Sequence, residues 1–399
     1  MFDKIEDAIK AIKGGGFVVV LDDEDRENEG DLVVAAEKIT AESVNFMMKE
    51  GRGLICAPIS SEIADRLNFH SMVEENTEAH RCDFTVSVDY KHGTTTGISA
   101  SDRAKTISAI ANGDSLAGDF VRPGHVFPLR AKDGGVLVRA GHTEASVDLA
   151  KLAGLVSAAS ICEITREDGE MMRRDELIEF AKKHKFPVVT IKDLIAYRRE
   201  KEKLVEFVAE ANLPTEFGDF LMKVYVDKIG GKEHVVLLKG KIDNEKGVLL
   251  RVQSECITGE VFKSLKCDCG NQLEYALKKI SEEGDGVVLY VRQEGRGIGL
   301  VNKIKAYALQ EQGFDTVTAN EKLGLPADLR DYGIGAQILA DLGIKNIRLM
   351  TNNPTKVVGL EAYGIKILER LPIEVPLNDK SVSYMKTKKY KMGHILKHV

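Results

Sequence analysis

Three cysteines in the second half of the chain have the spacing and surroundings of a metal site. Cys256, Cys267 and Cys269 lie within fourteen residues, in polar and glycine-containing segments. Three thiolates suit zinc, and three protein ligands leave open the fourth position that catalytic zinc sites use to activate water. No cysteine follows them and the next downstream histidine is His394, so a closed four-ligand site is not expected. Three buried free cysteines are the alternative, because free cysteine packs as a small apolar side chain.

A glycine-rich turn follows these cysteines. The stretch GVVLYVRQEGRGIGLVNKIKAYALQ predicts a buried strand, a turn with Gly295, Gly297 and Gly299, and then a helix. This order aims backbone N–H groups at an anion, but the glycines do not have the dinucleotide spacing G-x-G-x-x-G. The cationic side chains that favour a polyphosphate clamp are Arg292, Arg296 and Lys303. A plain strand–helix turn is the alternative.

Two later segments add polar groups that suit a phosphate or a base. Asp328 and Arg330 lie two residues apart, just before an expected helix, where a surface ion pair is the simpler interpretation. Thr351 begins the segment TNNPTK at the end of an expected strand, and Lys356 falls in the first turn of the following helix. This segment suits a phosphate contact and is equally a good helix start.

The first half contains an acidic loop between two apolar strands. Seven of the ten residues from Asp22 to Asp31 are acidic. Between buried segments these carboxylates repel one another unless a cation or a substrate accepts them, and hard ions such as Mg²⁺ prefer oxygen ligands. A calcium-binding EF-hand is excluded because Asn28 stands where that loop requires glycine. A solvated run of charges is the alternative.

Two histidines of the first half stand in glycine-flanked turns beside arginine. His125 lies in RPGHVFP and His142 in RAGHTE, and together they predict metal and sugar-phosphate binding, although either alone is more often structural. Glu163 follows Cys162 at the end of an expected strand. These groups mark the first half as a second candidate site.

Length and composition indicate two domains that position these groups. The chain has 399 residues, of which 43% are hydrophobic and 30% charged, and it is too long for one ordinary core. Five consecutive charged residues at 199–203 predict the end of a linker helix, so we expect domains at residues 1–199 and 200–399 joined by a short charged helical linker. The net charge of −6 provides no basic field for nucleic acid or an anionic membrane. No apolar run approaches the ~20 residues that span a bilayer and no export signal is visible, so we expect a cytoplasmic protein.

Strand and helix patterns alternate in both halves and predict α/β, or α+β, domains built on mixed sheets. The strand-like segments are FVVVL, GVLVRA, HVVLLKG, GVLLRV, GVVLYVR and IRLMT. The helix-like segments end in glycine and are NQLEYALKKISEEG, NKIKAYALQEQG and GAQILADLG. The order of the strands does not follow from these patterns.

The motifs SEC-x10-CDCG, RQEGRGIGL, ADLRDYG and TNNPTK of the second half resemble GTP cyclohydrolase II. The resemblance implies hydrolysis of GTP to 2,5-diamino-6-ribosylamino-4(3H)-pyrimidinone 5′-phosphate, formate and pyrophosphate, with Zn²⁺ on the three cysteines. The catalytic residues it implies are Asp328 as proton acceptor, Arg330 as nucleophile toward the α-phosphate and Tyr307 in ring opening. The GTP contacts it implies are Arg251, Val252, Gln253, Ser254, Glu255, Gln272, Glu294, Gly295, Arg296, Thr316, Thr351 and Lys356. Because a guanidinium stays protonated, we expect Arg330 to act first as a charge clamp on phosphate.

One position departs from the pattern of that family. The usual R-V-H-S-E-C stretch has Gln253 in place of its histidine. Glutamine forms hydrogen bonds but cannot take up a proton near neutral pH. If this position only orients the substrate, the second half is active, which we favour. The alternative is a degenerate nucleotide-binding or scaffolding module.

The first half, residues 1–199, resembles 3,4-dihydroxy-2-butanone 4-phosphate synthase in DDEDRENEGD, RPGHVFPL, RAGHTEASVDLA and the CEI segment. The resemblance implies conversion of D-ribulose 5-phosphate to L-3,4-dihydroxy-2-butanone 4-phosphate and formate with Mg²⁺ or Mn²⁺. The metal ligands it implies are Glu27 and His142. The substrate contacts it implies are Arg26, Glu27, Asp31, Arg139, Ala140, Gly141, His142, Thr143 and Glu163. Enolisation needs a base, for which we favour His125 and Glu163 over Glu29 and Cys56.

The order of the two halves resembles the bifunctional riboflavin biosynthesis proteins, in which these two enzymes are fused. That resemblance implies a homodimer with two small-molecule substrates and no nucleic-acid or membrane partner. A nicotinamide-dependent dehydrogenase that uses GRGIGL is a remote alternative, and a purely structural zinc-binding protein is another. The dehydrogenase would bind NAD(P)H without needing Cys267 or Cys269.

Overall fold

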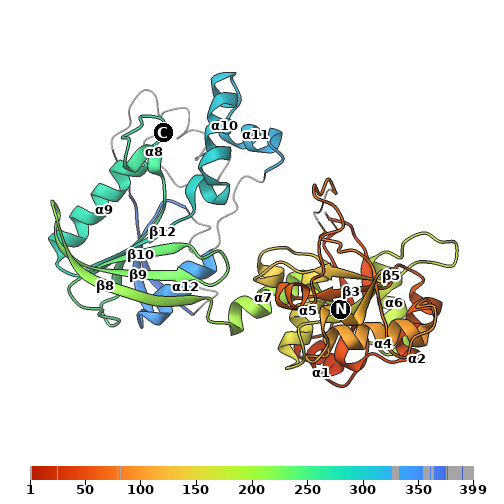
Figure 1. Cartoon of the computed structure of the whole chain (residues 1–399). Helices are drawn as coiled ribbons and strands as arrows, with labels where there is room; N and C mark the ends of the chain where they lie inside the picture. Colours follow the sequence, from red (N-terminus) through yellow and green to blue (C-terminus); the bar gives the residue numbers. More distant parts are fainter. Residues whose placement is uncertain are drawn as a thin grey trace. The chain divides into compact units, whose positions relative to one another are not determined.

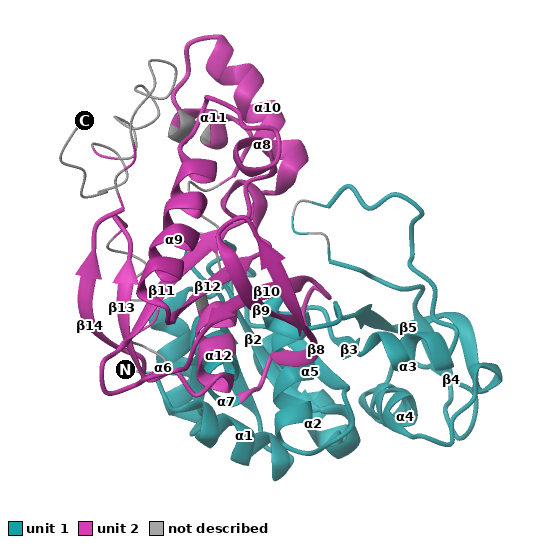
Figure 2. Cartoon of the chain, turned by 90° about the vertical axis from the view of Figure 1, so that its left-hand side faces the viewer, with its two compact units in different colours: residues 1–201 teal, residues 202–399 magenta. Residues whose placement is uncertain are grey.

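The computed structural model divides the chain into two compact units, residues 1–201 and 202–399 (Figure 2). It describes residues 2–24, 26–78, 80, 82–325, 332–353, 360, 364–373, 375 and 389. The boundary expected after residue 199 falls inside helix α7 (Ile191–Lys201). Ile191 and Leu194 of this helix are buried in the core of unit 1, so the charged segment at its end continues that unit.

Unit 1 is a mixed sheet with helices on both faces (Figure 1). Its strands are β1 (Val18–Leu21), β2 (Gly30–Ala35), β3 (Cys56–Ile59), β4 (Val88–Tyr90), β5 (Phe120–Arg130), β6 (Ala159–Glu163) and β7 (Val188–Thr190). Besides α7, its helices are α1 (Ile5–Lys13), α2 (Ala41–Phe46), α3 (Ser61–Arg66), α4 (Ala100–Ala111), α5 (His142–Leu152) and α6 (Arg174–His184). The strand order is β4-β5-β3-β6-β2-β1-β7, with β3–β5 and β1–β7 parallel and the other pairs antiparallel.

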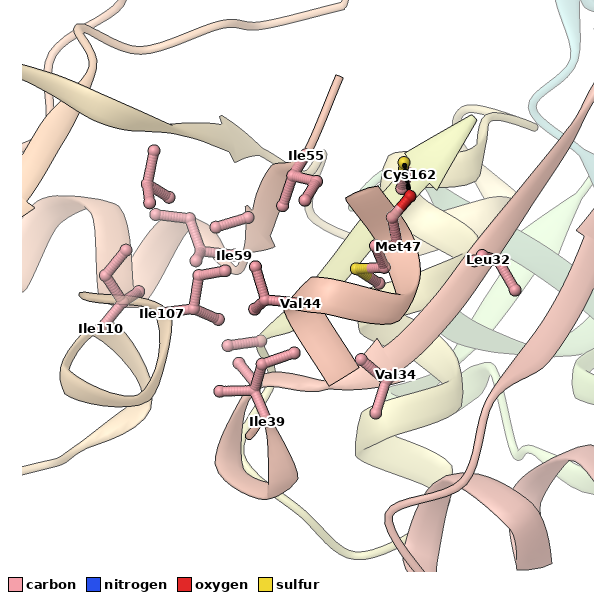
Figure 3. Packing of buried hydrophobic residues seen from close by; sticks show 14 of the residues in the cluster. Leu32, Val34, Ile39, Val44, Met47, Ile55, Ile59, Ile107, Ile110 and Cys162 are labelled. Atoms are coloured by element: carbon pink, nitrogen blue, oxygen red, sulfur yellow. Dashed lines mark hydrogen bonds between the residues drawn. The ribbon is translucent and has the colours of Figure 1, made fainter. Parts of the chain in front are cut away.

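The alternation of side chains along β6 separates two apolar cores. Ile161 packs in the core of α1, α5 and α7, whereas Cys162 packs in the core of α2, α4 and α6. Figure 3 shows Cys162 beside Met47, whose backbone oxygen accepts a hydrogen bond from the thiol at 3.7 Å. Because strand side chains alternate between faces, Glu163 emerges on the face covered by α5.

Unit 2 is a second mixed sheet. Its strands are β8 (Val205–Thr215), β9 (Gly218–Asp227), β10 (Glu233–Lys239), β11 (Val248–Ser254), β12 (Gly286–Val291), β13 (Asn346–Met350) and β14 (Lys366–Leu371). Its helices are α8 (Ile257–Glu260), α9 (Cys269–Glu283), α10 (Gly299–Glu311), α11 (Thr316–Lys322) and α12 (Tyr332–Asp341). Helix α9 packs on Val288 of β12, and α12 lies on the opposite face, where a Cβ at Gly335 would be 3.4 Å from Leu289.

The order of the second sheet brings three parallel strands together. The strands run β14-β13-β11-β12-β10-β9-β8, and the neighbours β13, β11 and β12 are parallel. Their carboxyl ends therefore meet at one edge of the sheet, the usual place for a ligand site in α/β proteins. Cys256, Arg292 and Thr351 follow these strands and lie at that edge.

The expected α/β architecture with two mixed sheets is confirmed, but one expected strand is wrong. The segment GVLVRA forms the short helical turn η4 (Gly135–Leu137) and a loop. Gly135 has a left-handed φ of 62°, and the Asp148 carboxylate accepts a hydrogen bond from the Val136 N–H at 2.8 Å, so the backbone turns instead of pairing with a neighbouring strand.

Within the described part of the chain, each helix is too short or too polar to cross a membrane.

Candidate functional sites

Asp22 shapes the acidic loop of unit 1. It follows β1, and its carboxylate accepts hydrogen bonds from the Arg26 guanidinium at 2.8 Å and from the backbone N–H groups of Glu27 at 3.1 Å and Glu29 at 2.9 Å. Because β1 and β2 are antiparallel neighbours, this loop closes a hairpin. The acidic run is therefore a folded turn, and a solvated run of charges does not describe it.

Three side chains at this loop form what we call the carboxylate–histidine cluster. One possible ligand atom each of Asp22, Glu27 and His142 lies within 4.8 Å of the others. The His142 Nε2 donates to the Val20 carbonyl oxygen at 3.1 Å, which leaves the Nδ1 lone pair for a metal. Burial lowers the pKa of His142, so the imidazole is neutral at pH 7, as a metal ligand must be. Asp22 is not among the metal ligands expected from the sequence, although its position as the first carboxylate after a buried strand is a signal for it.

Asp31 and Glu163 are carboxylic acids on neighbouring strands; Asp31 is buried and Glu163 is half-buried. They are direct partners in the register of β2 and β6. Burial, and then the charge of Glu163, raises the pKa of Asp31, and burial also raises the pKa of Glu163. The Leu54 N–H donates to Glu163 at 2.8 Å, and Gly53 makes room, since a Cβ there would lie 2.6 Å from Glu163 Oε2. Raised pKa values of this kind favour the protonated form of the pair, as general acid–base catalysis requires.

The segment from Arg139 to Thr143 leads into helix α5. The Arg139 guanidinium donates to the Glu144 carboxylate at 2.6 Å. Burial by itself would lower the pKa of Arg139. The charge of Glu144 and its hydrogen bond raise that pKa by more, so the pKa of Arg139 is raised overall. A side chain at Gly141 would meet this guanidinium, because a Cβ there would lie 2.3 Å from its Nη1. The positive N-terminus of an 11-residue helix beside a half-buried arginine suits an anion.

The other candidate bases expected from the sequence are His125, Glu29 and Cys56, and each has different surroundings. The His125 Nδ1 lies 2.7 Å from the Asp89 carboxylate, and its backbone N–H donates to the same group at 2.9 Å. Its side chain is 42% exposed, and its hydrogen bonds and ion pair in the described residues are with Asp89. Burial raises the pKa of Glu29 in the acidic loop. Burial raises the pKa of the Cys56 thiol far more, so this thiol is a poor base.

The three cysteines of unit 2 come together in what we call the cysteine cluster. Their sulfur atoms lie within 4.8 Å of one another, with 3.7 Å between Cys256 and Cys267. Gly259 packs against them, because a Cβ there would lie 2.6 Å from Cys267 Sγ and 3.3 Å from Cys256 Sγ. Hydrogen bonds from the Cys267 and Cys269 thiols hold the pKa of Cys256 well below that of a free thiol. Three converging sulfurs around a small space fit a zinc ion.

Lys303 of α10 is buried against the cysteine cluster. Its Nζ lies 3.2 Å from Cys256 Sγ, 2.8 Å from Thr258 Oγ1 and 2.8 Å from Glu294 Oε1. Burial alone lowers the pKa of Lys303, but Glu294 and the Cys256 thiolate outweigh it, so the ammonium stays charged. The Tyr307 hydroxyl lies 3.5 Å from Thr258 Oγ1, and burial raises the pKa of Tyr307 to about 12. The phosphate clamp expected from the sequence therefore does not include Lys303.

Gln253 is the centre of a buried polar network. Its Oε1 accepts hydrogen bonds from Arg251 Nε at 2.9 Å and Nη2 at 2.8 Å, and its Nε2 donates to the Glu260 carboxylate at 2.7 Å. Arg251 also donates to the Gln272 side-chain oxygen at 2.6 Å. Burial raises the pKa of Glu260. The neutral Gln253 side chain therefore accepts hydrogen bonds from Arg251 and donates one to Glu260.

Glu294 builds the glycine-rich turn after β12. Its carboxylate accepts hydrogen bonds from the backbone N–H groups of Ile257 at 2.7 Å and Gly295 at 2.8 Å. Gly295 and Arg296 have left-handed φ angles of 63° and 65°, so the turn reverses direction sharply there. The Glu294 side chain is occupied within the protein, which leaves the backbone of the turn as the part suited to an anion.

The remaining expected GTP contacts are spread over several elements. Those at the ends of the parallel strands are Val252 and Ser254 in β11, Glu255 after β11 and Thr351 after β13. Thr316 is the first residue of α11. Asp328, Arg330 and Lys356 lie outside the described residues.

Two family models match the chain, one for each unit. The model described as 3,4-dihydroxy-2-butanone 4-phosphate synthase matches residues 6–197. The model described as GTP cyclohydrolase II matches residues 206–372. The resemblance of each half to its family is thereby confirmed.

Curated relatives and a solved structure match almost the whole chain. The riboflavin biosynthesis protein RibBA of Bacillus cereus (strain ATCC 14579) is 57% identical over 99% of this chain and 100% of its own length. The protein of the same name from Bacillus subtilis (strain 168) is 56% identical with the same coverage. A crystal structure of RibBX from A. baumannii, titled a two-domain 3,4-dihydroxy-2-butanone 4-phosphate synthase, is 35% identical with a TM-score of 0.70. It covers 92% of this chain and 99% of that one.

Proposed function

The chain belongs to the RibBA family of riboflavin biosynthesis proteins, and on that premise we propose which of its residues carry the family's two reactions. The first half, a synthase, converts D-ribulose 5-phosphate to L-3,4-dihydroxy-2-butanone 4-phosphate and formate. The second half, a cyclohydrolase, hydrolyses GTP to 2,5-diamino-6-ribosylamino-4(3H)-pyrimidinone 5′-phosphate, formate and pyrophosphate. One observation supports the assignment of residues: among the described residues, a cluster with metal-ligand geometry lies in each unit.

In the first half, Glu27 and His142, together with Asp22, would hold Mg²⁺ or Mn²⁺. When bound, the ion polarises the substrate carbonyl and stabilises negative charge on the substrate oxygens. Glu163 would take the proton from the carbon beside that carbonyl, and Asp31 would share the proton with it. The raised pKa of both carboxyl groups supports this role, because an acid–base catalyst needs a pKa near the working pH.

The substrate phosphate and hydroxyl groups of the first reaction need further partners. We propose the N-terminus of α5, with the segment Arg139–Thr143, as the anion site, and Arg26 as a second cation beside the acidic loop. The helix dipole and the half-buried Arg139 guanidinium support this assignment. His125 would act as the second catalytic group of the reaction, with its imidazole oriented by Asp89.

In the second half, Cys256, Cys267 and Cys269 would hold Zn²⁺. When bound, the ion lowers the pKa of a water molecule that attacks the guanine ring. The pKa of about 12 keeps the Tyr307 hydroxyl protonated, so it would serve as a proton donor in ring opening. Gln253 would orient Arg251 as a neutral bridge, which supports activity of this half over a degenerate module.

GTP would be held along the carboxyl edge of the parallel strands and by the glycine-rich turn. The contacts we propose are Arg251 to Glu255, Gln272, Glu294 to Arg296, Thr316, Thr351 and Lys356. On the family resemblance, Asp328 would accept a proton and Arg330 would act at the α-phosphate, where its permanent charge suits a clamp.

We further propose a homodimer that works in the cytoplasm. Large apolar side chains exposed on unit 2 support a partner surface, among them Val261 at 66%, Phe262 at 72% and Val301 at 70% exposure. Three reduced thiols kept for a metal suit a reducing compartment. Light scattering of the purified chain at micromolar concentration tests the dimer.

Two reciprocal variants of the full chain test the residue assignment. We expect Glu163→Gln to reduce formate release from ribulose 5-phosphate by ~10²–10⁴-fold and to leave pyrophosphate release from GTP unchanged. Cys267→Ser should abolish turnover of GTP, reduce bound zinc and leave the first reaction intact. The activity that each variant keeps shows that its chain is folded, so each variant serves as the control for the other. Full GTP turnover by Cys267→Ser would contradict the zinc assignment, and a zinc-loaded wild-type chain inactive on GTP would support the degenerate module.

A further inference from the structure

Lys303 lies where three segments of unit 2 meet. It belongs to α10, Cys256 and Thr258 belong to the segment after β11, and Glu294 belongs to the turn after β12. The distances from Nζ to the acceptor atoms are 3.2 Å for Cys256 Sγ and 2.8 Å for each of the other two. An ammonium has three N–H donors, so each donor has one partner. Lys303 is only 8% exposed, and water therefore competes little for these hydrogen bonds.

We propose that Lys303 is the positioning residue of the zinc site, acting through its hydrogen bond to the Cys256 sulfur and its ion pair with Glu294. The proposal rests on the zinc site proposed for the cysteine cluster. Three thiolates and one Zn²⁺ ion carry a net negative charge, and a buried charge is costly unless a partner compensates it. The ammonium supplies that compensation, and Glu294 holds the ammonium in place.

The hydrogen bond also affects the metal through its ligand. An N–H donor on a metal-bound thiolate withdraws electron density from the sulfur, and the sulfur then donates less to the metal. The metal remains a stronger Lewis acid, which favours activation of water. Lys303 would therefore influence both the affinity for zinc and the rate of the GTP reaction without touching the substrate.

The same lysine orients Tyr307 through Thr258. Because Lys303 donates to Thr258 Oγ1, the hydroxyl hydrogen of Thr258 points to another acceptor. The two available atoms are Cys256 Sγ at 3.6 Å and the Tyr307 oxygen at 3.5 Å. Lys303 and Tyr307 are four residues apart on one face of α10, and the ammonium lies 5.8 Å from the centre of the Tyr307 ring. Loss of the lysine would therefore release a metal ligand and a candidate proton donor together.

The first test compares Lys303→Met with Lys305→Met in the full chain. Lys305 is an exposed residue of the same helix and is the matched control. We expect Lys303→Met to bind zinc ~10–100-fold more weakly in competition with a chelating dye. In the Co²⁺-loaded protein, the thiolate-to-metal charge-transfer band should move to lower energy, and Lys305→Met should match the wild type in both measurements. Wild-type zinc affinity and an unshifted band in Lys303→Met would overturn the proposal.

Two further variants keep the proposal testable if Lys303→Met does not fold. Lys303→Arg retains the cation and should recover part of the zinc affinity and of the band position. Glu294→Gln removes the anionic partner of Lys303, and it should move the band in the same direction. A Glu294→Gln band that stays at the wild-type position would overturn the proposal.

Turnover separates this proposal from the zinc site on which it rests. In Lys303→Met we expect kcat for GTP to fall more than KM changes, because Lys303 does not contact the substrate. A wild-type chain that takes up Co²⁺ without any thiolate charge-transfer band would overturn the zinc site itself. A normal wild-type band with no change in Lys303→Met would overturn only the role of Lys303.

Discussion

Asp31 and Glu163 face each other across strands β2 and β6, and burial raises the pKa of both carboxyl groups. Ionisation of both neighbouring acids is costly unless a cation compensates their charges. The carboxylate–histidine cluster offers a place for that cation, since Glu27 is among the charges that raise the pKa of both acids. In the proposed site, this repulsion would favour metal binding and would help the two acids to share a proton.

Replacement of Asp31 by asparagine should stabilise the metal-free protein in a pH-dependent way. A raised folded pKa means that the contribution of Asp31 is complete below its unfolded pKa of about 4 and is lost as the pH rises through the folded pKa. We expect Asp31→Asn to gain on the order of 1 kcal/mol over wild type at pH 8, with the difference shrinking toward pH 4. Thermal unfolding between pH 4 and pH 8 without divalent ions measures it. Asp114→Asn, at an exposed position, is the control, and a gain independent of pH would contradict the explanation.

The His125–Asp89 pair should act as one unit in the synthase reaction. The imidazole Nδ1 lies 2.7 Å from the Asp89 carboxylate, which orients the ring. We expect His125→Asn to lower turnover of ribulose 5-phosphate by ~10²–10⁴-fold and Asp89→Asn to lower it less. The double variant should be no slower than His125→Asn, because the carboxylate acts through the ring. Additive losses would argue for separate roles, and unchanged GTP turnover serves as the control.

Variants at position 253 should show whether a proton is transferred there. At pH 8 a neutral histidine accepts and donates as glutamine does, so we expect Gln253→His to keep GTP turnover within about an order of magnitude of wild type. Gln253→Met removes the acceptor of a buried arginine and should lose ~10–100-fold. Pyrophosphate release measures both variants. A large gain in Gln253→His would instead indicate that the natural chain lacks a proton-transfer group.

A methyl group at Gly259 should disturb the cysteine cluster directly. The added Cβ would lie 2.6 Å from Cys267 Sγ, closer than real Cβ contacts, so the sulfur or the backbone of residue 259 must shift. We expect Gly259→Ala to weaken zinc binding by about tenfold or more, measured by metal analysis and dye competition. Gly113→Ala, where a Cβ meets nothing within 4 Å, should bind zinc normally. Equal zinc affinity in both variants would mean that the sulfurs tolerate displacement.

Residue type and short spacing were enough to identify most of the chemistry. The cysteines of unit 2 and the acidic loop of unit 1 are recognisable because thiolates and clustered carboxylates are unusual beside apolar segments. The alternation of strand and helix patterns indicated mixed α/β units, since hydrophobic periodicity is a local property. GVLVRA misled because its apolar residues resemble a strand, whereas the backbone turns at Gly135 and the Asp148 carboxylate accepts the hydrogen bond of the Val136 N–H.

Tertiary structure alone decided which of these groups meet. Asp31 reaches Glu163 only through the pairing of β2 with β6, and Lys303 reaches Cys256 only because α10 packs beside the segment after β11. Strand order depends on the packing of whole elements, so no local pattern in the chain encodes it. For the same reason the sequence suggested phosphate as the partner of Lys303. The sequence shows that residue 303 is a cation, but the groups that pack around it in the folded protein determine which anion it pairs with.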